Sequence, residues 1–320
     1  MVSELLFSVV IPTYNRADTL LVTLNSVICQ TYPNFEIIVV DDGSTDNTQS
    51  VVANIKDDRL KYVRIENSER AAARNVGIQS SKASYITFLD SDDVLFRNHL
   101  EVAHAHLVAN RRPEVYHQAY AIQDGNVLKK KWTSFGEKDI NTALVTIGNV
   151  MSCMGVFIRK DVISDIKFNE DRDLSGFEDW ELWIRLAARY PIIYNPEITS
   201  ALVQHSGRSV SDISTQKMKN RVDRLIQYAF NDESIQTRFS AYRTRFKALV
   251  LSYASLHFSS SSKMRDKVSA VKYFLLAIRS YPLHLLTRRT LIIMRNLMIR
   301  WAGAAPIFLY AQTIFTIQNP

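Results

Sequence analysis

The stretch Tyr85-Ile86-Thr87-Phe88-Leu89-Asp90-Ser91-Asp92-Asp93 joins an apolar run directly to three carboxylates. Its first five residues carry mostly aromatic and branched side chains, which predicts a buried strand over 85–89. Three neighbouring carboxylates repel one another, and burying them is unfavourable unless a cation is present. The change from strand to acidic cluster therefore indicates a binding site at the end of a strand.

The residues before this stretch alternate between two apolar patterns. Apolar runs at 7–11, 35–40 and 60–65 predict three further strands, and a period near 3.6 residues predicts helices over 45–55 and 71–79. Strands that alternate with helices form right-handed βαβ units and a mostly parallel sheet. The predicted fold class is α/β, with a Rossmann-like central sheet.

The pattern changes twice further along the chain of 320 residues, which is long enough for one large α/β domain and an extension. Strands become sparse after residue 98, and only helical spacing remains after about residue 211. The predicted later strands are 115–123, 150–158 and 198–204. The predicted later helices are 178–189, 221–230, 235–258, 264–279 and 283–300. We therefore expect an all-α C-terminal extension.

Polar or aromatic side chains follow each of the four early strands. Pro12-Thr13-Tyr14-Asn15-Arg16 follows the first strand, and Asp41-Asp42-Gly43-Ser44-Thr45-Asp46 follows the second. Arg70 and Arg74 open the helix after the third strand, either as ordinary surface charges or as donors of charge-assisted hydrogen bonds to phosphate. Ligands bind beyond the carboxyl ends of strands in an open parallel sheet, so these groups share one candidate site.

The acidic clusters each have a structural and a functional explanation. Asp93 could cap a following helix, but a cap needs one carboxylate and residues 90–93 hold three. Mg²⁺ or Mn²⁺, which prefers oxygen ligands and shares its shell with substrate phosphates, explains all three. A turn and a helix cap likewise explain Gly43 and the residues after it, but not the adjacent pair Asp41 and Asp42.

Four motifs taken together resemble the family 2 glycosyltransferases of the GT-A fold. They are residues 9–16 (VVIPTYNR), 39–46 (VVDDGSTD), 73–78 (ARNVGI) and 88–93 (FLDSDD). The resemblance covers residues 6 to 210 and implies a GT-A catalytic domain over 1–212. Its nucleotide-sugar-binding half would be 6–98 and its acceptor half 99–212, followed by a helical basic region over 213–320.

The resemblance also implies roles for individual residues. Tyr14 would lie near the nucleotide base, Asp42 would contact the base, and Arg70 or Arg74 would face the diphosphate. Asp92 and Asp93 would contact the ribose and the metal. The implied nucleotide-sugar-binding residues are Pro12, Thr13, Tyr14, Arg16, Asp41, Asp42, Arg70, Arg74, Asp90, Ser91, Asp92, His205 and Arg208.

In such enzymes the catalytic base belongs to a Glu-Asp pair that opens a helix, and Gly176-Phe177-Glu178-Asp179-Trp180-Glu181-Leu182-Trp183 matches. The resemblance favours Asp179 as the base, with Glu178 as the second candidate. Acidic residues in the first turn also stabilise a helix dipole, which is the structural alternative. Trp180 could flank the sugar or lie in the core, and Trp183 is expected in the core.

The segment 205–211 resembles the family's loop in which His205 and Arg208 approach the diphosphate, and Gly207 would let this loop close as a lid. A solvated loop is the alternative.

The function implied is transfer of a sugar from a nucleotide-diphosphate sugar, most commonly a UDP-sugar, to a hydroxyl group. A carboxylate base would take the proton of that hydroxyl in a single, metal-assisted displacement with inversion. The acceptor would be a glycan, a lipid-linked glycan or a protein. A degenerate module that binds a nucleotide sugar or glycan without turnover is the alternative. A dinucleotide-dependent oxidoreductase is disfavoured because no Gly-x-Gly-x-x-Gly follows a strand.

Charge is unevenly distributed along the chain. Residues 216–320 hold 17 of the 39 Lys and Arg but only 4 of the 32 Asp and Glu. Residues 1–215 therefore carry a net negative charge. Residues 287–300 place arginines among aliphatic side chains, a pattern typical of peripheral helices on anionic membranes. The alternative is helices packed on the catalytic domain with solvated basic faces. The uncharged stretch 301–320 is a poor spanning segment, and no motif for nucleic acid is present.

The two cysteines, Cys29 and Cys153, are too few for a disulfide framework. We expect both to be small buried side chains in a reducing environment. The first seven residues lack the pattern of a secretory signal. The expected location is the cytoplasm, with peripheral attachment at the inner face of the plasma membrane.

Overall fold

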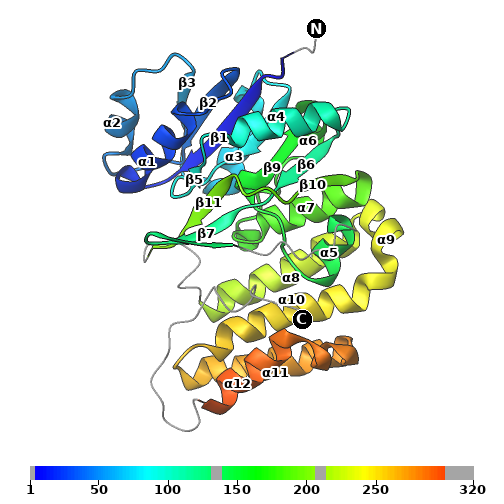
Figure 1. Cartoon of the computed structure of the whole chain (residues 1–320). Coiled ribbons are helices and arrows are strands. Elements are labelled where there is room, and N and C mark those ends of the chain that lie inside the picture. Colours follow the sequence, from blue (N-terminus) through cyan, green and yellow to red (C-terminus); the bar gives the residue numbers. More distant parts are fainter. Residues whose placement is uncertain (1–3, 131–138, 206–213, 300–320) are drawn as a thin grey trace.

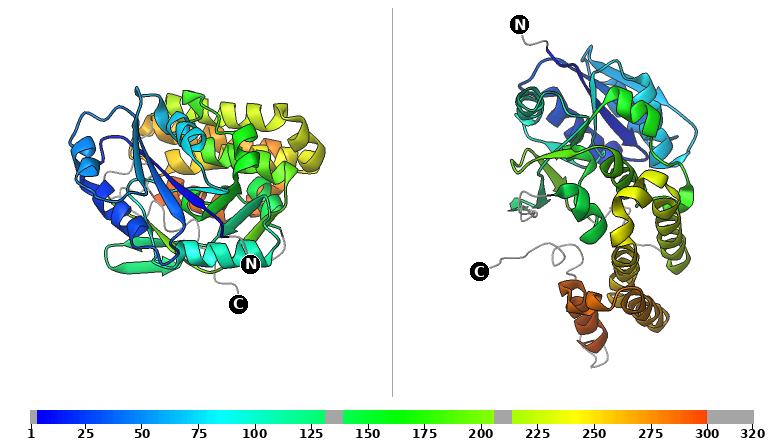
Figure 2. Two further views of the ribbon diagram at one scale, coloured as in Figure 1. Left: turned by 90° about the horizontal axis from the view of Figure 1, so that it is seen from above. Right: turned by 90° about the vertical axis from the view of Figure 1, so that its right-hand side faces the viewer.

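A computed structural model describes residues 4–130, 139–205 and 214–299 (Figure 1). The expectations for Arg208, for the loop 206–211 and for the stretch 301–320 lie outside these ranges. The described strands form two sheets. Helices cover both faces of the larger sheet, and a group of C-terminal helices extends from one side of the α/β part (Figure 2).

The larger sheet has seven strands in the order β10-β6-β9-β4-β1-β2-β3. Only β9 runs antiparallel to its neighbours, which confirms the predicted mostly parallel sheet. The strands are β1 (Phe7–Thr13), β2 (Phe35–Asp41), β3 (Leu60–Arg64), β4 (Tyr85–Phe88), β6 (Val115–Gln118), β9 (Val156–Arg159) and β10 (Ile192–Asn195).

The register of the sheet brings the predicted strand ends together. Thr13 at the end of β1 lies opposite Asp41 at the end of β2. Val10 of β1 lies opposite Phe88, so the chain after β4 emerges at the same edge. The structure therefore confirms that the segments after β1, β2 and β4 share one edge, as a parallel sheet requires.

The smaller sheet has the order β5-β11-β7-β8 and lies next to that edge. Its strands are β5 (Val94–Leu95), β7 (Ala121–Asp124), β8 (Val127–Lys130) and β11 (Ser200–Val203). The single strand expected over 115–123 is wrong, because the chain leaves the larger sheet after β6 and continues as β7 in the smaller one. Ala119 and Tyr120 at the break are compatible with a continuing strand, so periodicity alone does not reveal it.

The helices of the α/β part pack on both faces of the larger sheet. They are α1 (Ala17–Ile28), α2 (Thr48–Ala53), α3 (Glu69–Ser80), α4 (His99–Ala109), α5 (Ile140–Thr146), α6 (Lys160–Ile166) and α7 (Glu178–Arg189), with 3₁₀ turns η1 (Cys153–Gly155) and η2 (Arg172–Leu174). Residues of β1 alternate between two buried clusters, with Val10 in one and Val9 and Ile11 in the other. Apolar side chains therefore cover both faces, as expected for a parallel sheet.

One glycine sets how closely α3 approaches the sheet. A Cβ at Gly77 would lie 2.2 Å from a methyl carbon of Val10, so no side chain fits there. The close approach holds α3 against β1, and Arg74, one turn earlier on the same helix, is fully buried at 1% exposure. Helix packing thus positions a guanidinium group at the edge where the predicted site residues meet.

The C-terminal helices are α8 (Thr215–Asn231), α9 (Glu233–Phe239), α10 (Arg243–Ser259), α11 (Met264–Ser280) and α12 (Arg288–Ile299), with 3₁₀ turns η3 (Ser240–Tyr242) and η4 (Pro282–Leu286). The all-α extension is confirmed, but the helix expected over 235–258 is interrupted by η3. The helix expected over 283–300 begins only at Arg288, because η4 occupies its first residues. Buried residues of α8 and α10 belong to the same cluster as those of the sheet, such as Val10. None of the helices in the described ranges has the length and apolar character that crossing a bilayer requires.

Candidate active site

The acidic cluster forms a compact turn after β4. One carboxylate oxygen from each of Asp90, Asp92 and Asp93 lies within 4.8 Å of the others. Asp93 is 1% exposed, and its Oδ1 accepts a hydrogen bond of 3.0 Å from the Val203 N–H of β11. The capping explanation for Asp93 is wrong, because β5 follows it and the next helix begins at His99.

The chemistry of this donor set suits a hard divalent cation. The three carboxylates of the cluster repel one another. Mg²⁺ or Mn²⁺ bound between them would attract all three. Two cationic candidates approach the same place: Arg16 Nη2 lies 3.7 Å and His205 Nε2 3.0 Å from Asp92 Oδ2. The predicted residues Arg16, Asp92 and His205 are therefore brought together from the segments that follow β1, β4 and β11.

The predicted nucleotide pocket lies at the ends of β1 and β2. Pro12 and Thr13 are buried, whereas the Tyr14 ring is 47% exposed and accessible to a base. Asn15 adopts a left-handed conformation, with φ of 50°, and its Oδ1 accepts from the Thr45 N–H at 2.8 Å. This cross-link fixes the loop after β1 to the loop after β2.

The adjacent aspartates both make internal hydrogen bonds. Asp41 accepts from the Ser44 N–H at 2.8 Å and from the Tyr62 hydroxyl. Asp42 accepts from the Ser68 and Glu69 N–H groups, at 2.6 and 2.9 Å, where α3 begins. Burial raises the pKa of Asp42, and these two bonds oppose the rise. In this structure the pair organises the loop and the helix start, and its contact with a nucleotide remains a prediction.

Arg74 connects the acidic cluster to the start of α7. Its Nη2 lies 2.7 Å from Asp90 Oδ1, and its Nη1 lies 2.9 Å from Glu178 Oε1. The guanidinium also lies over the Phe168 ring, 5.2 Å from its centroid. Arg70 is farther out, with Nε 3.8 Å from the same Glu178 oxygen. The two halves of the predicted site are thus joined through one buried cation.

Glu178 and Asp179 have different electrostatic environments. Burial acts to raise the pKa of Glu178, but the positive charges of Arg70 and Arg74 outweigh it and hold the pKa below its usual value. Burial and the Glu178 carboxylate together raise the pKa of Asp179 to about 6. Neighbouring carboxylates with pKa values pushed apart are typical of separate catalytic roles, and the one nearer neutral pH suits a general base.

Asp179 is held by two hydrogen bonds. Its Oδ2 accepts from Asn149 Nδ2 at 2.9 Å, and its Oδ1 accepts from the Trp180 N–H at 2.7 Å. Sequence reasoning missed Asn149, because an isolated asparagine in a loop before η1 carries no motif. Helix α7 begins at Glu178, as the sequence predicts.

Both tryptophans of α7 lie in the core, which settles the open alternative for Trp180. It is 1% exposed, with its indole N–H donating to the Leu144 carbonyl at 2.9 Å, and Trp183 is 0% exposed. Cys153 is buried as expected, and burial raises the pKa of its thiol. The expectation for Cys29 is wrong, because it lies at the exposed end of α1.

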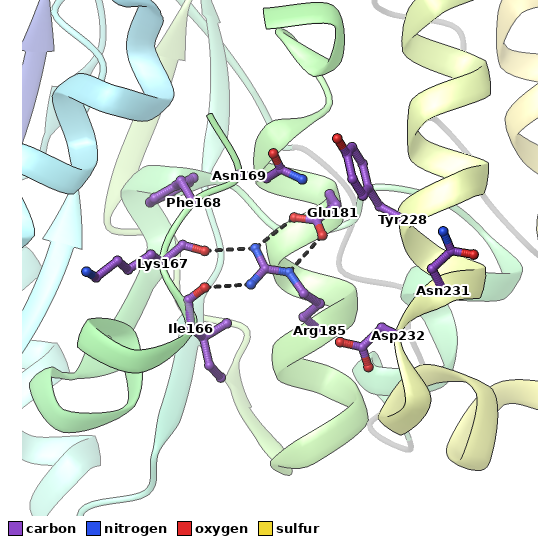
Figure 3. Close-up of a pocket in the computed structure, with 9 residues that line it drawn as sticks. All are labelled: Ile166, Lys167, Phe168, Asn169, Glu181, Arg185, Tyr228, Asn231 and Asp232. Atoms are coloured by element: carbon purple, nitrogen blue, oxygen red, sulfur yellow. Dashed lines mark hydrogen bonds and ion pairs between the residues drawn. The ribbon is translucent and has the colours of Figure 1, made fainter. Parts of the chain in front are cut away.

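A pocket of about 340 Å³ lies between α7 and α8 (Figure 3). Figure 3 shows Arg185 between Glu181 and two backbone carbonyls, with the Arg185 Nε 2.7 Å from Glu181 Oε1. None of the predicted site residues lines it. Its lining residues are Ile166, Lys167, Phe168, Asn169, Glu181, Arg185, Tyr228, Asn231 and Asp232.

The chain is similar to known proteins over most of its length. The sequence profile described as glycosyl transferase family 2 matches residues 8–166. An Escherichia coli UDP-Glc:alpha-D-GlcNAc-diphosphoundecaprenol beta-1,3-glucosyltransferase, WfgD, is 30% identical over 57% of this chain and 70% of its own. The amylovoran biosynthesis glycosyltransferase AmsB of Erwinia amylovora is 27% identical over 82% of this chain and 94% of its own. Against three uncharacterized Rickettsia glycosyltransferases, the matched region spans only 16%, 38% and 14% of their length.

Solved structures share the fold at low sequence identity. Staphylococcus aureus TarS 1-349 in complex with UDP-GlcNAc aligns with a TM-score of 0.68 and 21% identity, over 92% of this chain and 89% of that chain. The Pyrobaculum calidifontis mannosyltransferase PcManGT in complex with GDP-Man and Mn²⁺ aligns with a TM-score of 0.56 and 19% identity, over 94% and 87%. Together with the site geometry, these similarities show that the chain has the GT-A fold and belongs to glycosyl transferase family 2.

Proposed function

We propose that this protein transfers a sugar from a UDP-sugar to a hydroxyl group of a lipid-linked glycan, with inversion at the anomeric carbon. The observation that carries the proposal is the connection from Asp179, whose pKa is raised to about 6, through Glu178 and Arg74 to the acidic cluster at Asp90. Because Glu178 and Arg74 connect the proposed base to the proposed diphosphate site, the acceptor hydroxyl would lose its proton in the same site from which the nucleoside diphosphate departs.

The base in this proposal is Asp179. An acceptor hydroxyl is a poor nucleophile, and a carboxylate that removes its proton during attack accelerates the reaction by about 10²–10⁴. The hydrogen bonds from Asn149 and the Trp180 N–H fix the carboxylate of Asp179. Glu178 stays ionised and holds Arg74, so it acts as a positioning residue. A single base on the acceptor side corresponds to one displacement, and hence to inversion.

Asp92 and Asp93 would hold Mg²⁺ or Mn²⁺, with Asp90 completing the donor set. A cation bound there would neutralise charge on the departing nucleoside diphosphate. Arg16 and His205 approach Asp92 and would face the phosphates from the opposite side. Thr13, Tyr14 and Asp42 would contact the nucleoside, and Tyr14 offers the most accessible ring for stacking on the base.

The substrate classes follow from the proteins to which the chain is similar. WfgD uses UDP-Glc and a GlcNAc-diphosphoundecaprenol acceptor, and the TarS structure holds UDP-GlcNAc. Mn²⁺ accompanies the GDP-Man complex of PcManGT. These names support a UDP-sugar donor, a lipid-diphosphate acceptor and a divalent cation for this chain. We propose 1–212 as the catalytic domain, with halves 6–98 and 99–212, and 213–320 as the basic helical region.

We also propose peripheral contact between the C-terminal helices and the inner face of an anionic membrane. Eleven of the seventeen exposed large apolar side chains in the described residues lie between 264 and 298. The same segment contains seven Lys and Arg and one Asp. Leu286 is 83% exposed, and Leu291 and Met298 on α12 are each 63% exposed. Apolar side chains among arginines favour a bilayer with anionic headgroups, where a lipid-linked acceptor would reside.

The experiment is a transfer assay with purified protein, UDP-Glc or UDP-GlcNAc, Mn²⁺ and a synthetic GlcNAc-diphospholipid. We expect a disaccharide product whose new linkage has the β configuration by NMR, because both donors are α-linked and the displacement inverts. Retention of configuration would contradict the single displacement. Binding of the UDP-sugar without any transfer or hydrolysis would favour the alternative, a module that binds nucleotide sugar without turnover.

A further inference from the structure

Arg221 on α8 lies against the loop that leads into the catalytic helix. A Cβ at Gly176 would lie 2.9 Å from the Arg221 Cζ and Nη1, so the guanidinium rests on backbone that only glycine leaves open. Gly176 has φ of +93°, a conformation that also favours glycine, and its N–H donates to the Glu178 carboxylate. The close approach of Arg221 and the positive φ thus each require glycine at position 176, where an arginine from the C-terminal helices reaches the candidate site.

The Arg221 guanidinium is partly buried but has no hydrogen-bond or ion-pair partner within 4–130, 139–205 and 214–299. The arginine one turn later on α8 is different, since Arg224 Nε lies 3.1 Å from Asp171 Oδ2. Arg189 likewise lies 2.8 Å from Asp232. A cation that loses water contacts without gaining an acceptor is unfavourable. Such a side chain is suited to bind a ligand with anionic oxygen atoms.

Three arginines, Arg70, Arg74 and Arg221, lie around the Glu178 carboxylate. Burial lowers the pKa of Arg221, and the Glu178 carboxylate opposes that effect from nearby. Glu178, however, is already shared by Arg74 at 2.9 Å and Arg70 at 3.8 Å. Arg74 also pairs with Asp90 at 2.7 Å, and Glu69 acts on Arg221 only electrostatically, so no carboxylate of the described residues is in direct contact with Arg221. A phosphate or diphosphate, with several acceptor oxygens, is the ligand class that matches guanidinium groups best.

We propose that Arg221 binds a phosphate or diphosphate group of the acceptor beside Asp179. This proposal rests on the proposed transferase function and deepens it. The donor diphosphate is assigned to Asp92, Arg16 and His205, whereas Arg221 approaches the loop before Glu178 and Asp179. One acceptor molecule would then present its hydroxyl to Asp179 and its phosphate to Arg221. The site would select sugars linked through a diphosphate over neutral glycans.

The test compares two short-chain acceptor analogues by calorimetry, with UDP and Mn²⁺ saturating the donor site. One is GlcNAc joined through a diphosphate to an alkyl chain, and the other is the neutral alkyl glycoside of GlcNAc. The variants are Arg221→Gln, Arg221→Lys and the matched control Arg224→Gln on the same helix. We expect Arg221→Gln to weaken binding of the diphosphate analogue by about 10- to 100-fold, the loss of a charge-assisted hydrogen bond. The neutral analogue and the control should change less than about twofold.

Each outcome decides the proposal. Equal affinity of wild type and Arg221→Gln for the diphosphate analogue would overturn it. A separate titration with UDP distinguishes the source of the phosphate: weaker UDP binding in Arg221→Gln, with acceptor binding unchanged, would assign Arg221 to the donor and also overturn it. Arg221→Lys keeps the charge and should lose less affinity for the diphosphate analogue than Arg221→Gln. If Arg221→Gln does not fold, the affinity of Arg221→Lys for the two analogues tests the proposal instead. Failure of wild type to bind UDP would contradict the transferase function, while the diphosphate titration would still test Arg221.

Discussion

Replacing Asp179 by asparagine removes the proposed base and changes the site little otherwise. The carboxylate accepts from the Asn149 amide and from the Trp180 N–H. An amide at position 179 can keep the Trp180 bond with its oxygen. Asn149 can then rotate its own amide and accept from the new NH₂ group, because the Asn149 Oδ1 has no partner among the described atoms. Asp179→Asn should therefore fold and bind the donor normally.

The expected loss is catalytic. General bases contribute about 10²–10⁴ in rate, which corresponds to about 3–5 kcal/mol of transition-state free energy. We expect kcat for Asp179→Asn to fall by that factor, with the Kd for UDP within about threefold of wild type. The wild-type rate should also fall as the pH drops below about 6, because the carboxyl group, with its pKa raised to about 6, becomes protonated and can no longer accept a proton.

The assay measures release of UDP from a UDP-sugar between pH 4.5 and 8.5, with Mn²⁺ and the GlcNAc-diphospholipid present. Circular dichroism and UDP titration check the fold and donor site of the variant. A kcat within tenfold of wild type would show that Asp179 is not the base. Retention of the acidic limb near pH 6 in Asp179→Asn would assign that limb to another group.

Four further results are expected from the same structure. Glu178→Gln should lower the free energy of unfolding by about 3–5 kcal/mol, because it leaves the buried Arg74 with one fewer carboxylate. An unchanged midpoint of urea denaturation would show that the ion pair between Arg74 and Glu178 does not stabilise the protein. Asn149→Ala should move the acidic limb of the pH profile above about 6, since the Asn149 hydrogen bond lowers the pKa of Asp179; an unmoved or lower limb would count against it. Asp92→Asn, or EDTA with wild type, should reduce transfer by at least about 100-fold, and activity insensitive to both would exclude a metal at the cluster. In vesicle sedimentation, the double variant Leu286→Glu and Leu291→Glu should bind anionic vesicles at least about tenfold more weakly. The control Val127→Glu with Leu128→Glu, at apolar side chains on β8 that are each 55% exposed, should bind like wild type.

The sequence predicts the fold and one edge of the site well for a physical reason. Parallel strands end at a common edge, so the acidic run after Phe88 and the loops after Thr13 and Asp41 must meet once the alternation of strands and helices is recognised. The start of α7 at Glu178 follows equally from its first-turn carboxylates and apolar periodicity.

The remaining features depend on contacts between residues distant in sequence. Arg70 and Arg74, which lie more than 100 residues before Glu178, lower the pKa of Glu178, whereas burial by the packed helices and the Glu178 carboxylate raise the pKa of Asp179. Asn149 and Arg221 carry no motif, and their positions depend on a loop and on α8 packing beside α7. The break between β6 and β7 falls at Ala119 and Tyr120, which carry no turn signal in the sequence.

The most direct test of the account is the stability of the protein with UDP-sugars, measured by thermal unfolding with Mn²⁺ and with EDTA. The acidic cluster is proposed as the shared site of metal and diphosphate, so a UDP-sugar at about 100 times its Kd should stabilise the native state by about 2.7 kcal/mol with Mn²⁺. We predict that EDTA or Asp92→Asn abolishes this stabilisation. Indifference of the melting temperature to every nucleotide sugar, with Mn²⁺ present, would contradict the account.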